Sequence, residues 1–264
     1  MPELPEVETI VRGLSALSGS QISAADVRDA RLDVPVGVIV GAKIESIERR
    51  GKYIILNLAT RGSLVVHLRM SGRLVHTLDP AEEKYTRLVL HLTGGETVHF
   101  VDPRRLGTVT YCPQGFAASL GIEPLSVQFS VAALAGIVAS SRAPIKLVMM
   151  DQKKIAGIGN IYAAEALWRA KIDPRRAANT LTPRQVAALH RSVIDVLSEA
   201  IERMGTTLGT GVSDYRNSEG SRGGFQNRLS IYGRQGDPCE RCGETIERIV
   251  QAGRSTCLCP HCQR

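Results

Sequence analysis

The sequence has no long hydrophobic run: nowhere do about 18 apolar residues follow one another, as a membrane-spanning helix requires. Its opening, Met1 to Glu6, contains two glutamates and no basic residue, whereas a secretory signal peptide starts with positive charge and continues with an apolar stretch. There is also no internal repeat. These absences predict a cytoplasmic protein without membrane contact.

The composition excludes a disordered chain and a disulfide-rich secreted one. Apolar residues make up 43% of the chain, and the cysteines are not spread along it as a disulfide framework requires. Its 264 residues suffice for one large domain or two smaller ones. The 33 Lys and Arg exceed the 26 Asp and Glu, and the resulting charge of +7 favours a polyanionic partner without establishing one.

Five of the six cysteines lie close together late in the sequence. Cys239 and Cys242 form one C-x2-C pair, and Cys259 and Cys262 form a second. Two such pairs provide the four thiolates of a tetrahedral zinc site, so we predict one structural zinc ion. The alternatives are a redox dithiol and unligated core thiols. Cys257 is near enough to compete as a ligand, but the symmetric spacing of the pairs argues against it.

Residues 1–125 have the pattern of a strand-rich domain with a leading helix. Alternating apolar residues and glycine-containing turns recur at roughly ten-residue intervals, as in a sandwich or flattened barrel. The predicted strands are Lys52–Leu58, Ser63–Leu68, Thr86–Leu92, Thr97–Val101 and Thr108–Cys112. The leading helix has Pro5 near its first turn, where proline is tolerated. Its apolar face consists of Val7, Ile10, Val11, Leu14 and Leu17.

From about residue 129 the apolar spacing becomes helical. The predicted helices are Ile145–Asp151, a second one ending at Trp168, and Pro183–Met204, which begins with a capping box of Thr182 and Gln185. The fold class is therefore α+β.

Glycine and serine are frequent in residues 205–224, which are predicted to form a long mobile loop. The domains expected are a β-sandwich at 1–125, a helical domain at 126–225 and a zinc module at 226–264.

The turn Gly157-Ile158-Gly159-Asn160 is a candidate phosphate site. Glycines let the backbone approach a ligand, and the amides that open the following helix point outward. Asn160 can cap that helix or donate its side-chain amide to a phosphate. The alternative is a structural turn with an asparagine cap, in which case the nearby Lys146 belongs to a solvated face.

The N-terminus offers a nucleophile if Met1 is removed, as is usual before a small residue. Pro2 then exposes a secondary amine, and because α-amino groups have a pKa near about 8, part of it is uncharged at neutral pH. Such an amine attacks an aldehyde-like carbon to form an iminium. Glu3 and Glu6 can serve general acid–base catalysis there. The alternative is that Pro5 and the glutamates only start a helix.

Several motifs resemble the formamidopyrimidine-DNA glycosylases, bifunctional enzymes that excise oxidised purines such as 8-oxoguanine. These motifs extend over the whole chain in the family's order. They are Met1–Glu8, Lys52-Tyr53, His67–Gly72, Asp102–Gly107, Gly157–Tyr162, Tyr232–Arg234 and the four paired cysteines. The resemblance implies a nucleoid-associated monomer with a helix–two-turn–helix, acting on double-stranded DNA that contains oxidised bases opposite cytosine or abasic sites.

The resemblance implies a role for each of four catalytic candidates. Pro2 matches the nucleophile that attacks the deoxyribose C1′, and Glu3 matches the acid that protonates the sugar ring oxygen. Lys52 matches the lysine credited with proton transfer in β-elimination and with phosphate contact. Arg254 matches the arginine that grips phosphates beside the lesion and is credited in δ-elimination. No cofactor beyond structural zinc is implied.

The resemblance also implies roles for two glutamates and for residues that contact the DNA. Glu6 and Glu165 match family glutamates for which structural roles are equally open. The implied phosphate and DNA contacts are Arg142, Lys146, Asn160, Arg254 and Tyr85, which stands where a histidine is common. Ser221 and Arg222 lie in a stretch that resembles the loop closing over the everted base.

Three side chains match those that fill the gap left by the everted base: Met70, Arg104 and Leu106. The sequence departs from the family in two places, because Leu106 replaces an aromatic residue and Arg69 replaces a common glycine.

Two alternative functions remain. The sister endonuclease VIII type removes oxidised pyrimidines but usually has glycine where Leu4 stands, so Leu4 and Arg104 favour the purine enzyme. A zinc-finger DNA-binding protein without catalysis is disfavoured by the set of Pro2, Glu3 and Lys52.

Overall fold

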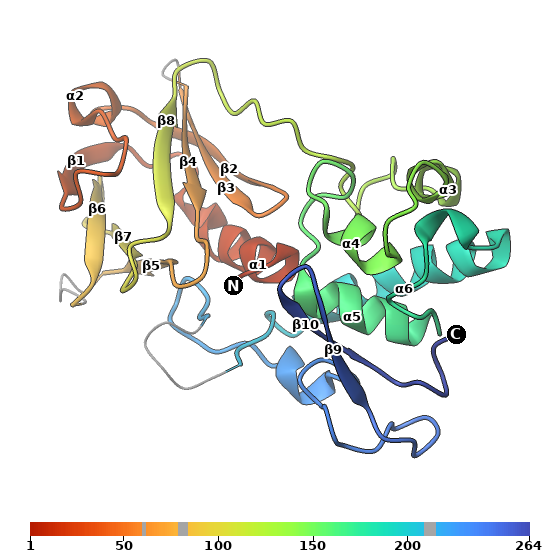
Figure 1. The fold of residues 1–264 in the computed structure, drawn as a ribbon. Coiled ribbons are helices and arrows are strands. Elements are labelled where there is room, and N and C mark those ends of the chain that lie inside the picture. Colours follow the sequence, from red (N-terminus) through yellow and green to blue (C-terminus); the bar gives the residue numbers. More distant parts are fainter. Residues whose placement is uncertain (60–61, 79–83, 209–214) are drawn as a thin grey trace. The chain divides into compact units, whose positions relative to one another are not determined.

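The computed structural model describes residues 1–59, 62–78, 84–208 and 215–264 (Figure 1). They form two compact units. The first combines Met1–Ala118 with Arg203–Gln226, and the second combines Ser119–Glu202 with Asn227–Arg264.

The first unit contains two four-stranded antiparallel sheets, with strand orders β1-β6-β7-β5 and β2-β3-β4-β8. The strands are β1 (Ile22–Val27), β2 (Ile44–Arg50), β3 (Tyr53–Leu58), β4 (Ser63–His67), β5 (Arg73–Thr77), β6 (Thr86–Leu92), β7 (Thr97–Val101) and β8 (Thr108–Cys112). The helices are α1 (Leu4–Leu14), followed by a 3-10 turn at Ser15–Leu17, and the short α2 (Val36–Ile39).

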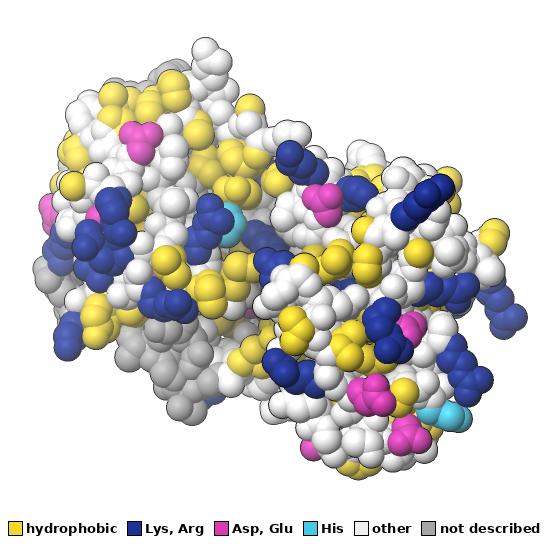
Figure 2. Space-filling model, in the orientation of Figure 1, with side chains coloured by type: hydrophobic (Ala, Val, Ile, Leu, Met, Phe, Trp, Pro, Cys, Tyr) yellow, Lys and Arg dark blue, Asp and Glu magenta, His cyan; other side chains and the backbone are white. Residues whose placement is uncertain are grey.

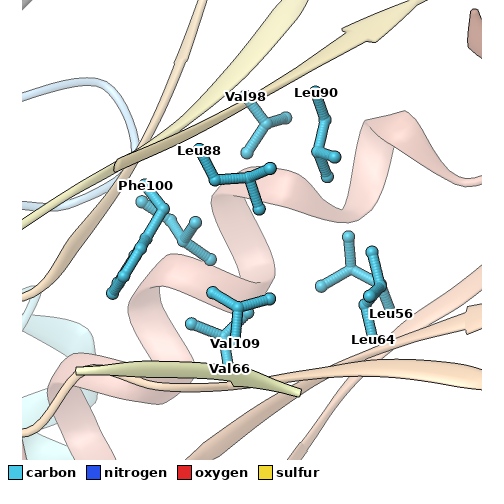
Figure 3. Close-up of a pocket in the computed structure, with 9 residues that line it drawn as sticks. Leu56, Leu64, Val66, Leu88, Leu90, Val98, Phe100 and Val109 are labelled. Atoms are coloured by element: carbon cyan, nitrogen blue, oxygen red, sulfur yellow. The ribbon is translucent and has the colours of Figure 1, made fainter. Parts of the chain in front are cut away.

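The apolar core of this unit lies between the two sheets, because alternate residues of each strand point to the same side. Figure 3 shows Leu56, Leu64, Val66 and Val109 of one sheet facing Leu88, Leu90, Val98 and Phe100 of the other. The same core includes the α1 residues Val7, Ile10, Val11 and Leu14. The predicted sandwich with a leading helix is confirmed.

All five predicted strands are present, with ends shifted by no more than one residue. Three strands of this unit were not predicted: β1, β2 and β5. Each lies at the edge of its sheet, and an edge strand is half solvated and carries polar residues that protect it from further pairing. The sequence of β2, IESIERR, shows this in four charged residues, which conceal the apolar alternation.

The second unit contains four α-helices and a β-hairpin. They are α3 (Val131–Ala139), α4 (Ile145–Met150), α5 (Asn160–Arg169), α6 (Pro183–Glu202), β9 (Glu247–Gln251) and β10 (Arg254–Leu258), with short 3-10 turns at Ala178–Thr180 and Phe225–Arg228. The latter turn extends across the boundary between the units.

The longest helix begins with the predicted capping box. The Thr182 amide donates to Gln185 Oε1 at 3.0 Å, and the Gln185 amide donates to Thr182 Oγ1 at 3.3 Å. The helix ends two residues earlier than predicted, because Met204 has a left-handed backbone with φ 58° and cannot continue it.

The glycine-rich segment differs from its predicted place in the helical domain. By its contacts, Arg203–Gln226 belongs with the sandwich, and the zinc module belongs with the helices. The Thr206 amide donates to Glu6 Oε1 at 2.8 Å, and the His76 amide donates to Ser218 O at 2.8 Å. Residues 209–214 of the predicted mobile loop lie outside the described residues.

Among the helices that the structure describes, none combines the length and the apolar composition that crossing a membrane requires.

Candidate functional site

The N-terminal residues are held by the start of α1. Glu3 is the N-cap of the helix and forms a capping box with Glu6, whose Oε2 accepts the Glu3 amide at 2.7 Å. Pro2, Glu3 and Glu6 are buried, whereas Met1 is exposed. The other Glu6 oxygen accepts the Thr206 amide, so Glu6 fixes both the helix start and the glycine-rich segment. Its contacts therefore indicate a structural role.

A cluster of basic groups lies around the end of β4. His67 is buried and packs edge-on against Tyr53 at 4.7 Å between ring centroids. Burial, together with the positive charges of Arg69 and Lys52, lowers the pKa of His67 to about 4. His67 Nδ1 accepts the Arg69 amide at 3.0 Å. The ring is therefore neutral near pH 7 with its proton on Nε2.

The three predicted gap-filling residues lie on two loops. Met70 is on the β4–β5 loop, and Arg104 and Leu106 are on the β7–β8 loop; all three are exposed. Arg104 Nη1 lies 4.0 Å from Met70 Sδ. The structure therefore brings together an exposed guanidinium and an exposed apolar side chain from separate loops, as a wedge into stacked bases needs.

Tyr85 lies beside the second of these loops and is partly buried. Its backbone carbonyl accepts the Asp102 amide at 3.0 Å, and Lys84 Nζ lies 5.6 Å from the centroid of its ring.

The four paired cysteines of the second unit form a compact cluster. The sulfur atoms of Cys239, Cys242, Cys259 and Cys262 all lie within 4.8 Å of one another. Four thiolates at this spacing fit one tetrahedral zinc ion, whose effect is to crosslink the module. Cys257 is outside the cluster, with its Sγ 3.7 Å from Gln235 Oε1. Cys257 is therefore not part of the four-sulfur group, in line with the spacing argument.

Two predicted phosphate ligands, Lys146 and Asn160, donate hydrogen bonds to the β9–β10 hairpin. Lys146 is almost fully buried, so it does not belong to a solvated face; its Nζ donates to Ser255 O at 3.2 Å and to Thr256 Oγ1 at 2.6 Å. Asn160 Nδ2 donates to the same Ser255 carbonyl at 3.1 Å. The N-cap of α5 is Gly159, so Asn160 does not cap the helix. Both side chains fix the strand in which Arg254 is the first, exposed residue.

Glu165 fastens the segment that leads to the zinc module. Its carboxylate is fully buried and accepts the backbone amides of Ser230, Ile231 and Tyr232 at 2.8–3.0 Å. Burial raises the pKa of Glu165, and the three amide hydrogen bonds act in the opposite direction. Its contacts are structural.

Comparison with known protein families decides the identity of the chain. Residues 1–109 match the formamidopyrimidine-DNA glycosylase N-terminal domain, residues 120–211 match the H2TH domain of the same family, and residues 236–264 match the zinc finger found in FPG and IleRS. The chain belongs to the formamidopyrimidine-DNA glycosylase family. The sequence resemblance is thus confirmed, and the four-cysteine cluster is the family's zinc finger.

Full-length relatives support this assignment. The chain is 44% identical to the formamidopyrimidine-DNA glycosylase of Paracoccus denitrificans and 42% identical to that of Desulforamulus reducens, with 100% of this chain and at least 99% of each relative covered. Among solved structures, the MutM (Fpg) protein of Thermus thermophilus has a TM-score of 0.89 and 41% identity, over 99% of this chain and 98% of that one. The Lactococcus lactis Fpg in complex with abasic-site DNA has a TM-score of 0.87 and 33% identity, over 99% of each chain.

Two residues of this glycosylase-family chain were quoted in motifs but not singled out from the sequence. His67 was visible only as part of His67–Gly72, and its position beside Lys52 and Arg69 becomes evident only in the folded chain. Asp102 opens the second motif, and its buried carboxylate bonds to both loops that carry the gap-filling residues. The available signal was an acidic residue that directly follows the buried strand β7.

Proposed function

We propose that this protein is a bifunctional base-excision repair enzyme that removes oxidised purines opposite cytosine and then cleaves the DNA strand at the abasic site. The substrate class is supported by two Lactococcus lactis Fpg structures, one with abasic-site DNA and one, of a mutant, with Fapy-dG DNA. The observation that carries the reaction is the N-terminus, where Pro2 precedes the buried Glu3 at the start of a fixed helix.

The base-excision step uses the Pro2 amine once Met1 has been removed. The nitrogen attacks the deoxyribose C1′, so that a C–N bond forms while the bond from C1′ to the base breaks, and the proton that the nitrogen loses is balanced by the one that the departing base takes up. Glu3 protonates the ring oxygen as the sugar opens, which leaves an iminium between Pro2 and C1′. The capping hydrogen bonds hold Glu3 against α1, and this fixed position lowers the entropic cost of orienting the acid.

Strand cleavage follows from the iminium, which withdraws electrons from the neighbouring carbons. Loss of a proton from C2′ breaks the C3′–O bond, and a second elimination breaks the C5′–O bond. Lys52 is assigned to proton transfer in the first elimination. Arg254 is assigned to the phosphate that leaves in the second, because it is an exposed cation on a hairpin fixed by zinc and Lys146.

DNA binding is proposed to depend on two kinds of residue. Arg142 and Arg254 are exposed and can contact phosphates directly, and the partly buried Tyr85 can donate its hydroxyl. Lys146 and Asn160 act by holding the hairpin. The face in Figure 2 carries more Lys and Arg than Asp and Glu, in line with the net charge of +7 and a polyanionic ligand.

Borohydride trapping tests the proposal. The protein is incubated with a duplex containing 8-oxoguanine opposite cytosine, and borohydride reduces the iminium to a stable amine. We expect a covalent adduct that mass spectrometry maps to Pro2. The matched control is the same protein with Met1 retained, in which the Pro2 nitrogen is an amide; it should bind the duplex but form no adduct and leave the strand uncut.

The alternatives give different results in the same assay. An adduct formed only with oxidised-pyrimidine duplexes would indicate the endonuclease VIII type. Binding without an adduct on either duplex would indicate a DNA-binding protein without catalysis. Normal cleavage by the protein with Met1 retained, verified by mass, would overturn the role of Pro2.

A further inference from the structure

Two neighbouring loops of the sandwich carry the three exposed gap-filling residues, and we call them the wedge loops. The first is Leu68–Gly72, between β4 and β5, with Met70; the second is Asp102–Gly107, between β7 and β8, with Arg104 and Leu106. Within the described part of the chain, which includes both loops entirely, no backbone ladder joins one loop to the other. The flanking strands pair at both ends of the loops, with Arg73 opposite Val101 and His67 opposite Thr108. The sheets therefore place the loop ends, and the loop interiors are joined by side chains.

The Asp102 carboxylate provides that connection. It is fully buried, and its Oδ1 accepts the Ser71 hydroxyl of the first loop at 2.5 Å and the Arg104 amide at 3.2 Å. Its Oδ2 accepts the amides of Leu106 and Gly107, each at 2.7 Å. One carboxylate thus receives a hydrogen bond from the first loop and three from the second.

Arg105, which lies between Arg104 and Leu106, is held by contacts that do not involve Asp102. Arg105 has a left-handed backbone with φ 55°, which is unfavourable for a residue with a Cβ. Its guanidinium makes a two-pronged ion pair with the buried Asp29, with Nε–Oδ2 at 2.9 Å and Nη2–Oδ1 at 2.7 Å. This ion pair holds the middle residue of the exposed segment Arg104–Leu106 in place.

Both loops also pack closely on one ring. A Cβ at Gly72 would lie 3.1 Å from Phe100 Cε2 and 2.6 Å from Leu68 O, and a Cβ at Gly107 would lie 2.6 Å from Phe100 Cζ and 3.2 Å from Asp102 Oδ2. Glycine at these two positions lets the loops approach Phe100 and the carboxylate from both sides.

We propose that Asp102 is a positioning residue that, through Ser71, makes the wedge loops a single rigid unit and thereby sets discrimination of the base opposite the lesion. This inference rests on the proposed function. Met70 and Arg104 must enter the same gap in the duplex, and the Arg104 donors must meet the acceptors of cytosine. Fixing the loops before binding removes the entropic cost of ordering them and prevents Arg104 from adjusting to another base.

The test removes the bond between the loops and leaves the carboxylate in place. In Ser71→Ala, Asp102 keeps its three amide donors, so the second loop stays folded while the first is released. We expect the ratio of 8-oxoguanine excision opposite cytosine to excision opposite adenine to fall about 2- to 10-fold, a factor typical for one hydrogen bond. Ser71→Thr keeps a hydroxyl and should restore the ratio.

A matched control separates positioning from stability. Ser63 is another buried serine of the same unit, and its hydroxyl donates to Asn57 Oδ1 at 2.7 Å, away from the wedge loops. Ser63→Ala should lower the thermal midpoint about as much as Ser71→Ala but leave the cytosine:adenine ratio unchanged. Equal ratios in Ser71→Ala, Ser63→Ala and the unmodified protein would overturn the positioning role.

A single-stranded oligonucleotide with an abasic site distinguishes failure of this inference from failure of the proposed function. It has no opposite base, so Ser71→Ala should form the borohydride adduct on it at the unmodified protein's rate. If the unmodified protein forms no adduct on any substrate, the proposed function is wrong. If it forms one and only the ratio is insensitive to Ser71, Asp102 has no positioning role.

Discussion

At the scale of single residues, the β7–β8 loop places different side chains in different surroundings. Arg104, Arg105 and Leu106 are all exposed, and the Arg105 guanidinium is paired with the buried Asp29. A guanidinium has only donors, which suit the O2 and N3 acceptors of an unpaired cytosine, whereas adenine offers an amino donor on the same edge.

Arg104→Ala should therefore relax the preference for cytosine over adenine. The cost of a wrong base, about 1–3 kcal/mol, should largely disappear when the donors are removed. Leu106→Phe should tighten binding of the lesion duplex with little change in that preference, because an aromatic ring restores stacking worth about 1–3 kcal/mol in single-strand systems. Both the base preference and the binding are measured as excision rates and affinities on duplexes that differ only in the opposite base. If Arg104→Ala keeps the cytosine:adenine ratio of the unmodified protein, another residue recognises the opposite base.

Arg69 has a left-handed backbone with φ 52°, where glycine is favoured. Arg69→Gly should stabilise the protein by about 0.5–1 kcal/mol in urea unfolding, because the strain of the Cβ is removed. Arg105→Gly is the matched control: its φ of 55° is similar, but it loses the ion pair to Asp29 and should destabilise. Equal destabilisation by both changes would show that Arg69 makes stabilising contacts that offset the strain.

At the scale of elements, the β9–β10 hairpin is fixed at two places. The cysteine cluster closes its base, and Lys146 with Asn160 holds the Ser255 carbonyl next to Arg254. Backbone amides alone could not fix an exposed hairpin so firmly, since an isolated two-stranded hairpin is marginally stable in water.

Cys259→Ser should release zinc and unfold the hairpin, because metal binding supplies much of the folding free energy of such a module. Strand cleavage should then be lost together with the position of Arg254. Cys257→Ser should keep one zinc ion per chain, since its sulfur faces Gln235 rather than the cluster. Zinc content by elemental analysis and circular dichroism are the measurements, and a zinc-free Cys257→Ser protein would contradict the ligand assignment.

The strands and helices differ in how well the sequence predicted them. Inner strands such as β3 and β4 were found because both faces of their sheet are buried and their apolar residues are dense. The edge strand β1 was not found, because its sequence ISAADV has few large apolar residues. The edge strand β8 was found, because Val109 and Tyr111 alternate with threonines. The long helix α6 was found with its cap, because both its apolar stripe and its first turn are local features.

At the scale of the whole molecule, the chain has 33 basic and 26 acidic residues, and this excess of positive charge predicts electrostatic binding to a polyanion. Each phosphate that a cation neutralises releases counterions, so log affinity should fall linearly with log salt, with a slope of about −0.9 per phosphate contact. Titrations of a lesion duplex at several salt concentrations measure it. We expect a slope of several units, reduced by about one in Arg142→Ala. A nearly flat plot would contradict phosphate binding.

The sequence by itself determined the features whose parts lie close together in the chain. The zinc site follows from two C-x2-C pairs, and the helix that presents Pro2 and Glu3 follows from a local apolar stripe and Pro5. The motifs also identified the family, which the comparisons confirmed.

Only the tertiary structure decided which distant residues support the site. Glu6 bonds to Thr206, Ser71 to Asp102, and Lys146 to Thr256, at sequence separations of 200, 31 and 110 residues. These pairs leave no periodic signal, because a buried polar group is satisfied by whichever donor or acceptor the packing brings near it. For the same reason Lys146, expected at the surface, proved to be buried, and the glycine-rich segment proved to belong with the sandwich.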